Sequence, residues 1–132
     1  METPLFRKVD CVSYPVRDLD RALEFYRDRL GHALIWRSPT AVGLRMPDTN
    51  AELVLHTDEG RPPAAELMVD AVPDAVARFV AAGGALVYGP IEIQIGRCAV
   101  VTDPFGNALV LLDCSKGLLH IDADGNVVPR DA

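Results

Sequence analysis

The fold of the first half of the chain is decided by residues 16–31, VRDLDRALEFYRDRLG. Asp18 is placed to cap the first turn of a helix with a side-chain oxygen, and Leu23 and Tyr26 follow at helical spacing. Gly31 tolerates the left-handed backbone conformation in which many helices end. The stretch therefore predicts a helix that begins after Asp18 and ends before Gly31.

Short strands are predicted on both sides of this helix. The segment 8–16 is rich in β-branched valines and predicts the strand before it. Pro39 and the cluster 47–50 mark turns after it. Between and beyond these turns, strands are predicted over 33–37, 42–46 and 51–57.

The same pattern begins again after the linker Arg61-Pro62-Pro63. A second helix is predicted over 73–82, and the turn DPFGN at 103–107 separates the last two strands. The matching positions of the two copies, at one constant offset, are Val16 and Val69, Ala22 and Ala75, Tyr26 and Phe79, and Gly31 and Gly84. The predicted strands of the second copy cover 66–70, 86–88, 97–102 and 108–113.

This internal repeat predicts an α+β fold of two tandem β-α-β-β-β modules, at about 8–58 and 64–114. A single module cannot bury both faces of its sheet, so two copies are expected to form one curved mixed sheet around a concave cleft, with the helices outside. We expect residues 1–117 to form one domain and residues 118–132 to form a C-terminal tail or hairpin.

The tail contains the sequence DADGN at 122–126, which resembles the opening of a calcium-binding loop. A calcium loop of that kind needs an acidic residue at its twelfth position, and the chain has none there. A plain hairpin turn is therefore predicted.

The composition restricts the partners and the compartment. The chain has 132 residues and a net charge of −6, which disfavours nucleic acid and anionic membranes because both are bound by clustered Lys and Arg. The three cysteines, Cys11, Cys98 and Cys114, are predicted to be free thiols. No signal-peptide or membrane-spanning run is present, so a soluble cytoplasmic protein is expected.

Two motifs on this duplicated framework carry a family resemblance. Residues 16–22 with Phe25-Tyr26 and Leu30-Gly31 resemble the first-module signature of the vicinal oxygen chelate superfamily. The DPFGN turn before an apolar strand is similar to its second-module signature. The superfamily includes glyoxalases, epimerases, extradiol dioxygenases and bleomycin-resistance proteins. Most of its enzymes hold a divalent metal ion with His, Gln or Glu, and the metal ion acts as a Lewis acid.

The resemblance implies four metal-ligand positions, and this chain departs from the pattern at each of them. The first-strand positions of the two modules fall on Cys11 and Ala64, and the last-strand position of module two falls on Val110. The matching position in module one falls on Leu53 or Val54, depending on where a gap is placed. Aliphatic side chains cannot coordinate a metal, so the usual metal site and any other cofactor are expected to be absent.

Strand alternation predicts which side chains face away from the helices. In the strand over 51–57, Leu53 and Leu55 suit the helix side, which turns Glu52, Val54 and His56 to the cleft. The constant-offset alignment of the repeats favours the opposite register, so both remain open at this point. The candidate ligand-binding residues of the whole chain are Cys11, Ser13, Trp36, Arg45, Glu52, His56, Glu66, Met68, Tyr88 and Arg97.

Several of these candidates have alternative interpretations. Cys11, Glu52, His56 and Glu66 suit a relocated divalent metal site, or His56 and Glu66 act as a metal-free acid–base pair, or these side chains have no chemical role. Arg97 either meets an anionic ligand or forms an ion pair with Glu92 or Asp113. Trp36 and Tyr88 either stack on a planar ligand or pack within the protein, and Cys11 is either a reactive thiol or a small buried residue. The alternating run 91–95 is an edge strand, a loop over the cleft or a dimer contact.

These considerations favour a protein that binds a small organic molecule in the cleft between the modules, similar to the bleomycin-resistance branch. Two other roles remain open. One is a lyase or isomerase similar to glyoxalase I or the epimerases, with a relocated metal or metal-free acid–base residues. The other is a structural or regulatory module that acts as a dimer, with the concave face filled by its own side chains. A homodimer with a small-molecule ligand is expected, without nucleic acid or membrane as partner.

Overall fold

A computed structural model describes residues 3–129 of the chain. The outermost residues of the predicted domain and tail, 1–2 and 130–132, lie outside the described part. The elements are β1 (Lys8–Pro15), α1 (Leu19–Leu23), the π-helical turn η1 (Glu24–Arg29), β2 (Leu34–Arg37), β3 (Ala41–Arg45), β4 (Glu52–His56), β5 (Ala64–Met68), α2 (Val72–Ala81), β6 (Ala85–Glu92), β7 (Arg97–Thr102) and β8 (Ala108–Leu112).

The chain divides into two compact units. Among the described residues, module one contains Cys11–Pro63 and 120–129, and module two contains 3–10 and Ala64–Leu119. The boundary falls inside β1, so this strand contributes residues to both modules.

The two modules have the same topology. Strand order is β2-β3-β4-β1 in module one and β5-β8-β7-β6 in module two. In each, the first strand pairs in parallel with the last, and the remaining pairs are antiparallel. The predicted repeat of β-α-β-β-β modules, the α+β class and the mixed sheet are confirmed.

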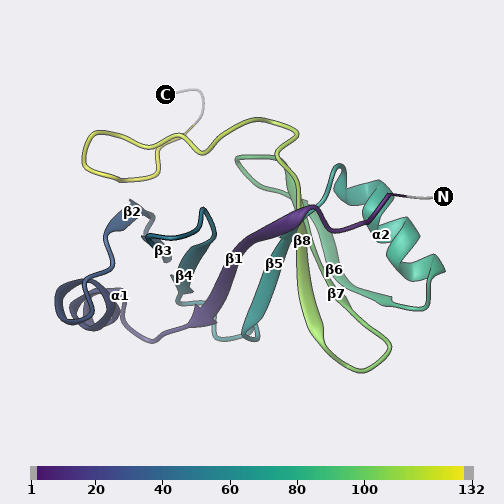
Figure 1. The fold of residues 1–132 in the computed structure, drawn as a ribbon, viewed down its shortest axis with the longest axis horizontal. Coiled ribbons are helices and arrows are strands. Elements are labelled where there is room, and N and C mark those ends of the chain that lie inside the picture. Colours follow the sequence, from purple (N-terminus) through teal and green to yellow (C-terminus); the bar gives the residue numbers. More distant parts are fainter. Residues whose placement is uncertain (1–2, 130–132) are drawn as a thin grey trace. The chain divides into compact units, whose positions relative to one another are not determined.

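Each module packs its helix on one face of its strands (Figure 1). The core of module one consists of Leu19, Ala22, Leu23, Val42, Leu44 and Leu55. The core of module two consists of Val69, Val72, Ala75, Val76, Ala99, Val101 and Leu111. Because a strand turns alternate residues to opposite faces, each module keeps a second face without a helix. We call these the helix-free faces.

The helix ends follow the sequence signals. Asp18 caps α1 by accepting hydrogen bonds from the backbone N–H groups of Asp20 (2.9 Å) and Arg21 (3.2 Å). Gly31 has a φ of 87°, the left-handed conformation expected after a helix end. The π-helical geometry of η1 was not predicted, because spacings of three and four residues suit both kinds of helix.

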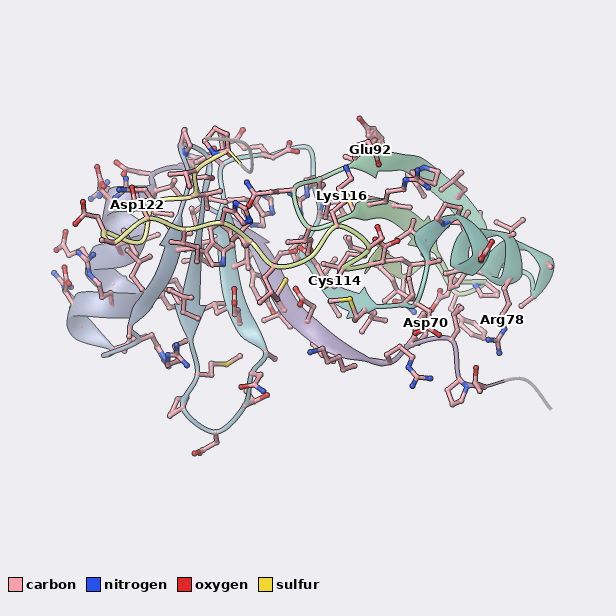
Figure 2. The ribbon with its side chains drawn as sticks, turned by 90° about the horizontal axis from the view of Figure 1, so that it is seen from above. Asp70, Arg78, Glu92, Cys114, Lys116 and Asp122 are labelled. Atoms are coloured by element: carbon pink, nitrogen blue, oxygen red, sulfur yellow. The ribbon has the colours of Figure 1, made fainter. Side chains whose placement is uncertain are left out.

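The tail forms the predicted turn and pairs with module one. Asp122, labelled in Figure 2, accepts hydrogen bonds at Oδ1 from the N–H groups of Asp124 and Asn126 (both 2.9 Å). Arg37 of β2 donates its N–H to Gly125 and accepts from the N–H of Val127 (both 2.7 Å). The tail therefore hydrogen-bonds to the outer strand of module one.

No helix of residues 3–129 is long and apolar enough to cross a membrane. The three cysteines are free thiols, as predicted.

Candidate ligand-binding face of module one

Strand register determines which side chains share the helix-free face of module one. Val54 of β4 pairs with Gly43 of β3 and with Ser13 of β1. Paired residues on neighbouring strands point to the same side of the sheet, so Val54, Gly43 and Ser13 share one face. The residues two positions away from them along each strand lie on that face too. Its members are Cys11, Ser13, Pro15, Trp36, Ala41, Gly43, Arg45, Glu52, Val54 and His56.

This register decides between the two orientations of β4. Leu55 is fully buried in the core against α1, and Leu53 packs beside it. Glu52, Val54 and His56 therefore lie on the helix-free face, and the orientation favoured by the constant-offset alignment is wrong. The alignment fails because the loop before the last strand is one residue longer in module one, 46–51, than in module two, 103–107.

The Trp36 side chain is held in place by two contacts on this face. Its indole Nε1–H donates a hydrogen bond of 2.7 Å to Glu52 Oε1. Its five-membered ring occupies the space that a Cβ on Gly43 would take. Trp36 is half-buried in this position. Only glycine at residue 43 leaves room for the ring. The lack of a side chain at Gly43 therefore allows the observed position of Trp36.

The His56 side chain is buried at the end of β4, with 2% of its surface exposed. Its Nδ1 lies 3.2 Å from the backbone nitrogen of Asp58, which donates to it. Its Nε2 has no hydrogen-bond partner among the described residues. Burial lowers the pKa of His56, and the nearby positive charge of Arg61 lowers it further, while Asp58 partly opposes both. The imidazole is therefore neutral at pH 7.

Cys11 and Ser13 lie on the same face as Glu52, as predicted, and both are buried at 3% and 1% exposure. Cys11 is therefore a small buried residue, in agreement with the second interpretation of its role. Arg45 is the register partner of Glu52 and is exposed at the end of β3.

The remaining candidates belong to module two. Glu66 pairs with Val110, and Val100 pairs with both Val110 and Tyr88, so these residues share the helix-free face of module two. Met68 is on the same face, where its sulfur lies 3.8 Å from the thiol of Cys114 (labelled in Figure 2).

Arg97 forms the predicted ion pair with Glu92, and its side chain is 48% exposed. Its Nε lies 2.9 Å from Glu92 Oε2, and its backbone N–H donates to Asp113 Oδ1 at 3.0 Å. Lys116 Nζ lies 3.4 Å from Glu92 Oε1 (Figure 2). The predicted alternating run 91–95 is divided, because β6 ends at Glu92 and Ile93 starts a turn closed by Gly96.

The equivalent residues of the two modules are now defined by register. Ser13 pairs with Val54 in module one as Glu66 pairs with Val110 in module two. Val54, rather than Leu53, therefore occupies the last-strand position of module one. Within residues 3–129, no three His, Cys, Asp or Glu side chains gather closely enough to hold a metal ion.

Pro15, Ala41 and Gly43 lie on this face and were not identified from the sequence as part of it. Gly43 is a single glycine within a strand, a signal of close backbone approach that the sequence offered. The hydrogen bond from the N–H of Asp58 to the imidazole of His56 was not predicted from the sequence.

Comparison with protein families gives a match over residues 8–111 to the model described as the Glyoxalase/Bleomycin resistance protein/Dioxygenase superfamily. A comparison with curated proteins gives no match.

Solved structures share the fold at low sequence identity. Methylmalonyl-CoA epimerase from Mycobacterium tuberculosis is 24% identical, with a TM-score of 0.69 over 87% of this chain and 93% of that one. Streptomyces coelicolor methylmalonyl-CoA epimerase in complex with 2-nitronate-propionyl-CoA is 19% identical, with a TM-score of 0.69 over 85% and 99%. A hypothetical protein from Bacillus halodurans is 13% identical, with a TM-score of 0.70 over 86% and 98%. At these identities the likeness concerns the fold alone.

Proposed function

Since the chain belongs to the Glyoxalase/Bleomycin resistance protein/Dioxygenase superfamily, we propose that it binds a small organic molecule and does so without the metal ion of the family's enzymes. The helix-free face of module one forms a wall of the binding site in this proposal. Trp36 supplies an aromatic surface that Glu52 and Gly43 hold in one orientation.

The observation that carries the proposal is the pair of valines on the last strands. Val54 and Val110 occupy equivalent positions on the helix-free faces, where the family resemblance leads us to expect coordinating side chains. Neither valine has a lone pair to offer a metal ion. The first-strand positions carry Cys11 and Ala64, so Cys11 is the single side chain of the four with a coordinating atom.

A relocated metal site at Glu52 and His56 is a weaker alternative. The two residues are four positions apart on one strand, which separates their Cα atoms by about 13 Å. Metal–ligand bonds are only about 2.0–2.2 Å long, so both side chains would have to extend fully toward each other. Glu52 instead accepts a hydrogen bond from Trp36.

A metal-free lyase or isomerase with His56 as base is also less well supported. A general base needs a nitrogen with a free lone pair. In His56 the lone pair of Nδ1 accepts the N–H of Asp58, and the other nitrogen then carries the proton. His56 is therefore suited to donate a hydrogen bond rather than to remove a proton from a substrate.

A cytoplasmic homodimer remains part of the proposal. Strand β6 is an edge strand with exposed apolar side chains, which suit contact with a second copy. These side chains are Leu86, Val87, Tyr88 and Ile91. Sedimentation of the wild type and of Val87→Asp tests this state, since a monomeric wild type would exclude it.

The function is tested by elemental analysis of the tag-free protein, before and after incubation with zinc, nickel, manganese or iron(II), followed by a small-molecule thermal-shift screen. We expect no stoichiometric metal and at least one organic molecule that raises the Tm. Trp36→Ala is expected to weaken binding of that molecule, measured by calorimetry, whereas Tyr14→Ala on the opposite face of the sheet leaves it unchanged. A stoichiometric metal ion would contradict the proposal.

A further inference from the structure

The buried side chain of His56 contains a donor that the protein itself does not use. The Nδ1 atom accepts the N–H of Asp58, so the proton of the neutral ring is on Nε2. That N–H is closed to solvent and has no acceptor among residues 3–129. Buried donors without a partner are rare in native proteins, because each one loses its hydrogen bond to water.

The neighbours of His56 on the same face explain why no acceptor is present. Its strand partners are Pro15 on β1 and Ala41 on β3, and Val54 precedes it on the same side of β4. These three side chains are apolar. The neighbours of His56 within the sheet therefore offer no side-chain acceptor to the Nε2 proton.

Burial lowers the pKa of the His56 imidazole and favours the neutral ring, and the nearby charges act in opposite directions. Arg61 contributes a positive charge that opposes protonation of the ring. Asp58 contributes a negative charge, but its Oδ1 accepts the N–H of Gly60 at 3.0 Å.

We propose that Nε2–H of His56 donates a hydrogen bond to a carbonyl or carboxylate oxygen of the bound molecule, and thereby selects ligands that carry such an oxygen beside a planar apolar body. This inference rests on the proposed function and names its ligand class. A ligand reaches Nε2 only by moving the side chains that close it from solvent.

The geometry of the face fits a ligand of that kind. Trp36 lies over Gly43, whose strand partner is Val54, and His56 is two residues further along β4. Two residues of a strand span about 7 Å, close to the length of a substituted aromatic ring. A planar molecule beside Trp36 and Val54 thus places a substituent oxygen near Nε2.

The first experiment measures ¹⁵N chemical shifts of the histidines between pH 6 and 8. We expect His56 to remain neutral with its proton on Nε2. Benzoate and benzamide are expected to shift the Nε2 signal, and toluene is not. A proton on Nδ1 would overturn the inference without any ligand being involved.

The second experiment compares the same three probes by calorimetry with two matched variants. In His56→Asn the side-chain oxygen replaces Nδ1 as acceptor for Asp58, but no donor reaches the position of Nε2. In His56→Gln the amide nitrogen reaches it. We expect the wild type and His56→Gln to bind benzoate or benzamide about tenfold more tightly than toluene, and His56→Asn to lose that preference.

The outcomes separate the two proposals. Equal preference in wild type and His56→Asn would overturn the role of His56 and leave small-molecule binding intact. Failure of all three probes to bind the wild type would count against an aromatic ligand and against both proposals. Benzoate bound more tightly than benzamide identifies a carboxylate, and the reverse identifies a neutral carbonyl.

Discussion

At the scale of single residues, close contacts with glycine decide which side chains hold their positions. The ring of Trp36 fills the space above Gly43, and the carboxylate of Asp113 fills the space beside Gly96 in the same way. In both cases a methyl group on the glycine would collide with the functional part of its neighbour. The two glycines therefore preserve the orientation of an aromatic ring and of a buried charge.

Gly43→Ala is expected to force Trp36 away from the sheet and to break its hydrogen bond to Glu52. Overpacking of this kind costs about 1–3 kcal/mol of unfolding free energy. Trp36 is the single tryptophan of the chain, so the fluorescence emission reports on it alone. We expect the emission of Gly43→Ala to shift toward the red and its urea midpoint to fall. Gly60→Ala, where a Cβ meets only Asp58 Oδ1 at 3.3 Å, is the control and should leave the emission unchanged.

Asp113 is a buried carboxylate with a structural role in module two. It is 1% exposed and accepts hydrogen bonds from the N–H of Val72 at the start of α2 (2.8 Å), from the N–H of Arg97 (3.0 Å), and from the hydroxyl of Ser115 (2.8 Å). Burial alone raises the pKa of Asp113, but these hydrogen bonds outweigh it and hold the pKa below its ordinary value.

Asp113→Asn is therefore expected to lower the unfolding free energy by about 1–3 kcal/mol at pH 7, since the amide nitrogen cannot accept an N–H. The folded-state pKa is depressed, so the carboxylate stabilises the fold fully above about pH 4 and loses this effect as the pH falls through the folded-state value. The difference in unfolding free energy between the wild type and Asp113→Asn, measured by urea titration, should therefore become smaller as the pH falls. Asp48→Asn, in an exposed turn, is the control; a gap independent of pH would contradict the assignment.

At the scale of elements, the tail and β2 show how an edge strand is covered. The N–H and C=O of Arg37 both bond to the tail, to Gly125 and Val127. Unpaired edge strands offer a template for pairing with other chains. The tail occupies part of that template in module one.

Val127→Pro removes the N–H that donates to Arg37, whereas Val127→Ala keeps it. We expect the proline variant to speed hydrogen exchange of the Arg37 amide, which is bonded to Gly125 in the same bridge, and the alanine variant to change it little. Equal protection in both variants would mean that the tail does not protect this edge.

The elements were predicted well from sequence, and their contacts were not. Periodicity located seven of the eight described strands within one or two residues, with the β5 prediction, 66–70, displaced toward α2 from Ala64–Met68. The prediction of 86–88 for β6 stops four residues before the end of the observed strand, Ala85–Glu92. Alternation favoured the observed orientation of β4, with Leu53 and Leu55 on the helix side, but the alignment of the repeats favoured the opposite one, so the sequence left the orientation open. The contact of Trp36 with Gly43 depends on an irregular register between β2 and β3, which no local pattern reveals.

At the scale of the whole molecule, the two modules have separate cores but share a strand. The residues of β1 up to Asp10 belong to module two, and those from Cys11 belong to module one. Arg7, just before the strand, donates its N–H to Met68 of β5 at 2.8 Å. Loss of structure in module two therefore releases the strand whose continuation pairs with β4 of module one.

This shared strand predicts that both modules unfold together. Leu111 of module two and Leu55 of module one are fully buried, so Leu111→Ala and Leu55→Ala each remove about 2–5 kcal/mol of stability. Trp36 reports on module one alone, and far-UV circular dichroism reports on both. For Leu111→Ala we expect the urea midpoint of Trp36 fluorescence to fall as far as that of the dichroism, as in a two-state transition. A different result would contradict this prediction: a Trp36 midpoint at the wild-type value together with a dichroism signal that changes in two steps. Each module would then fold independently, because destabilisation of module two would not reach module one through β1.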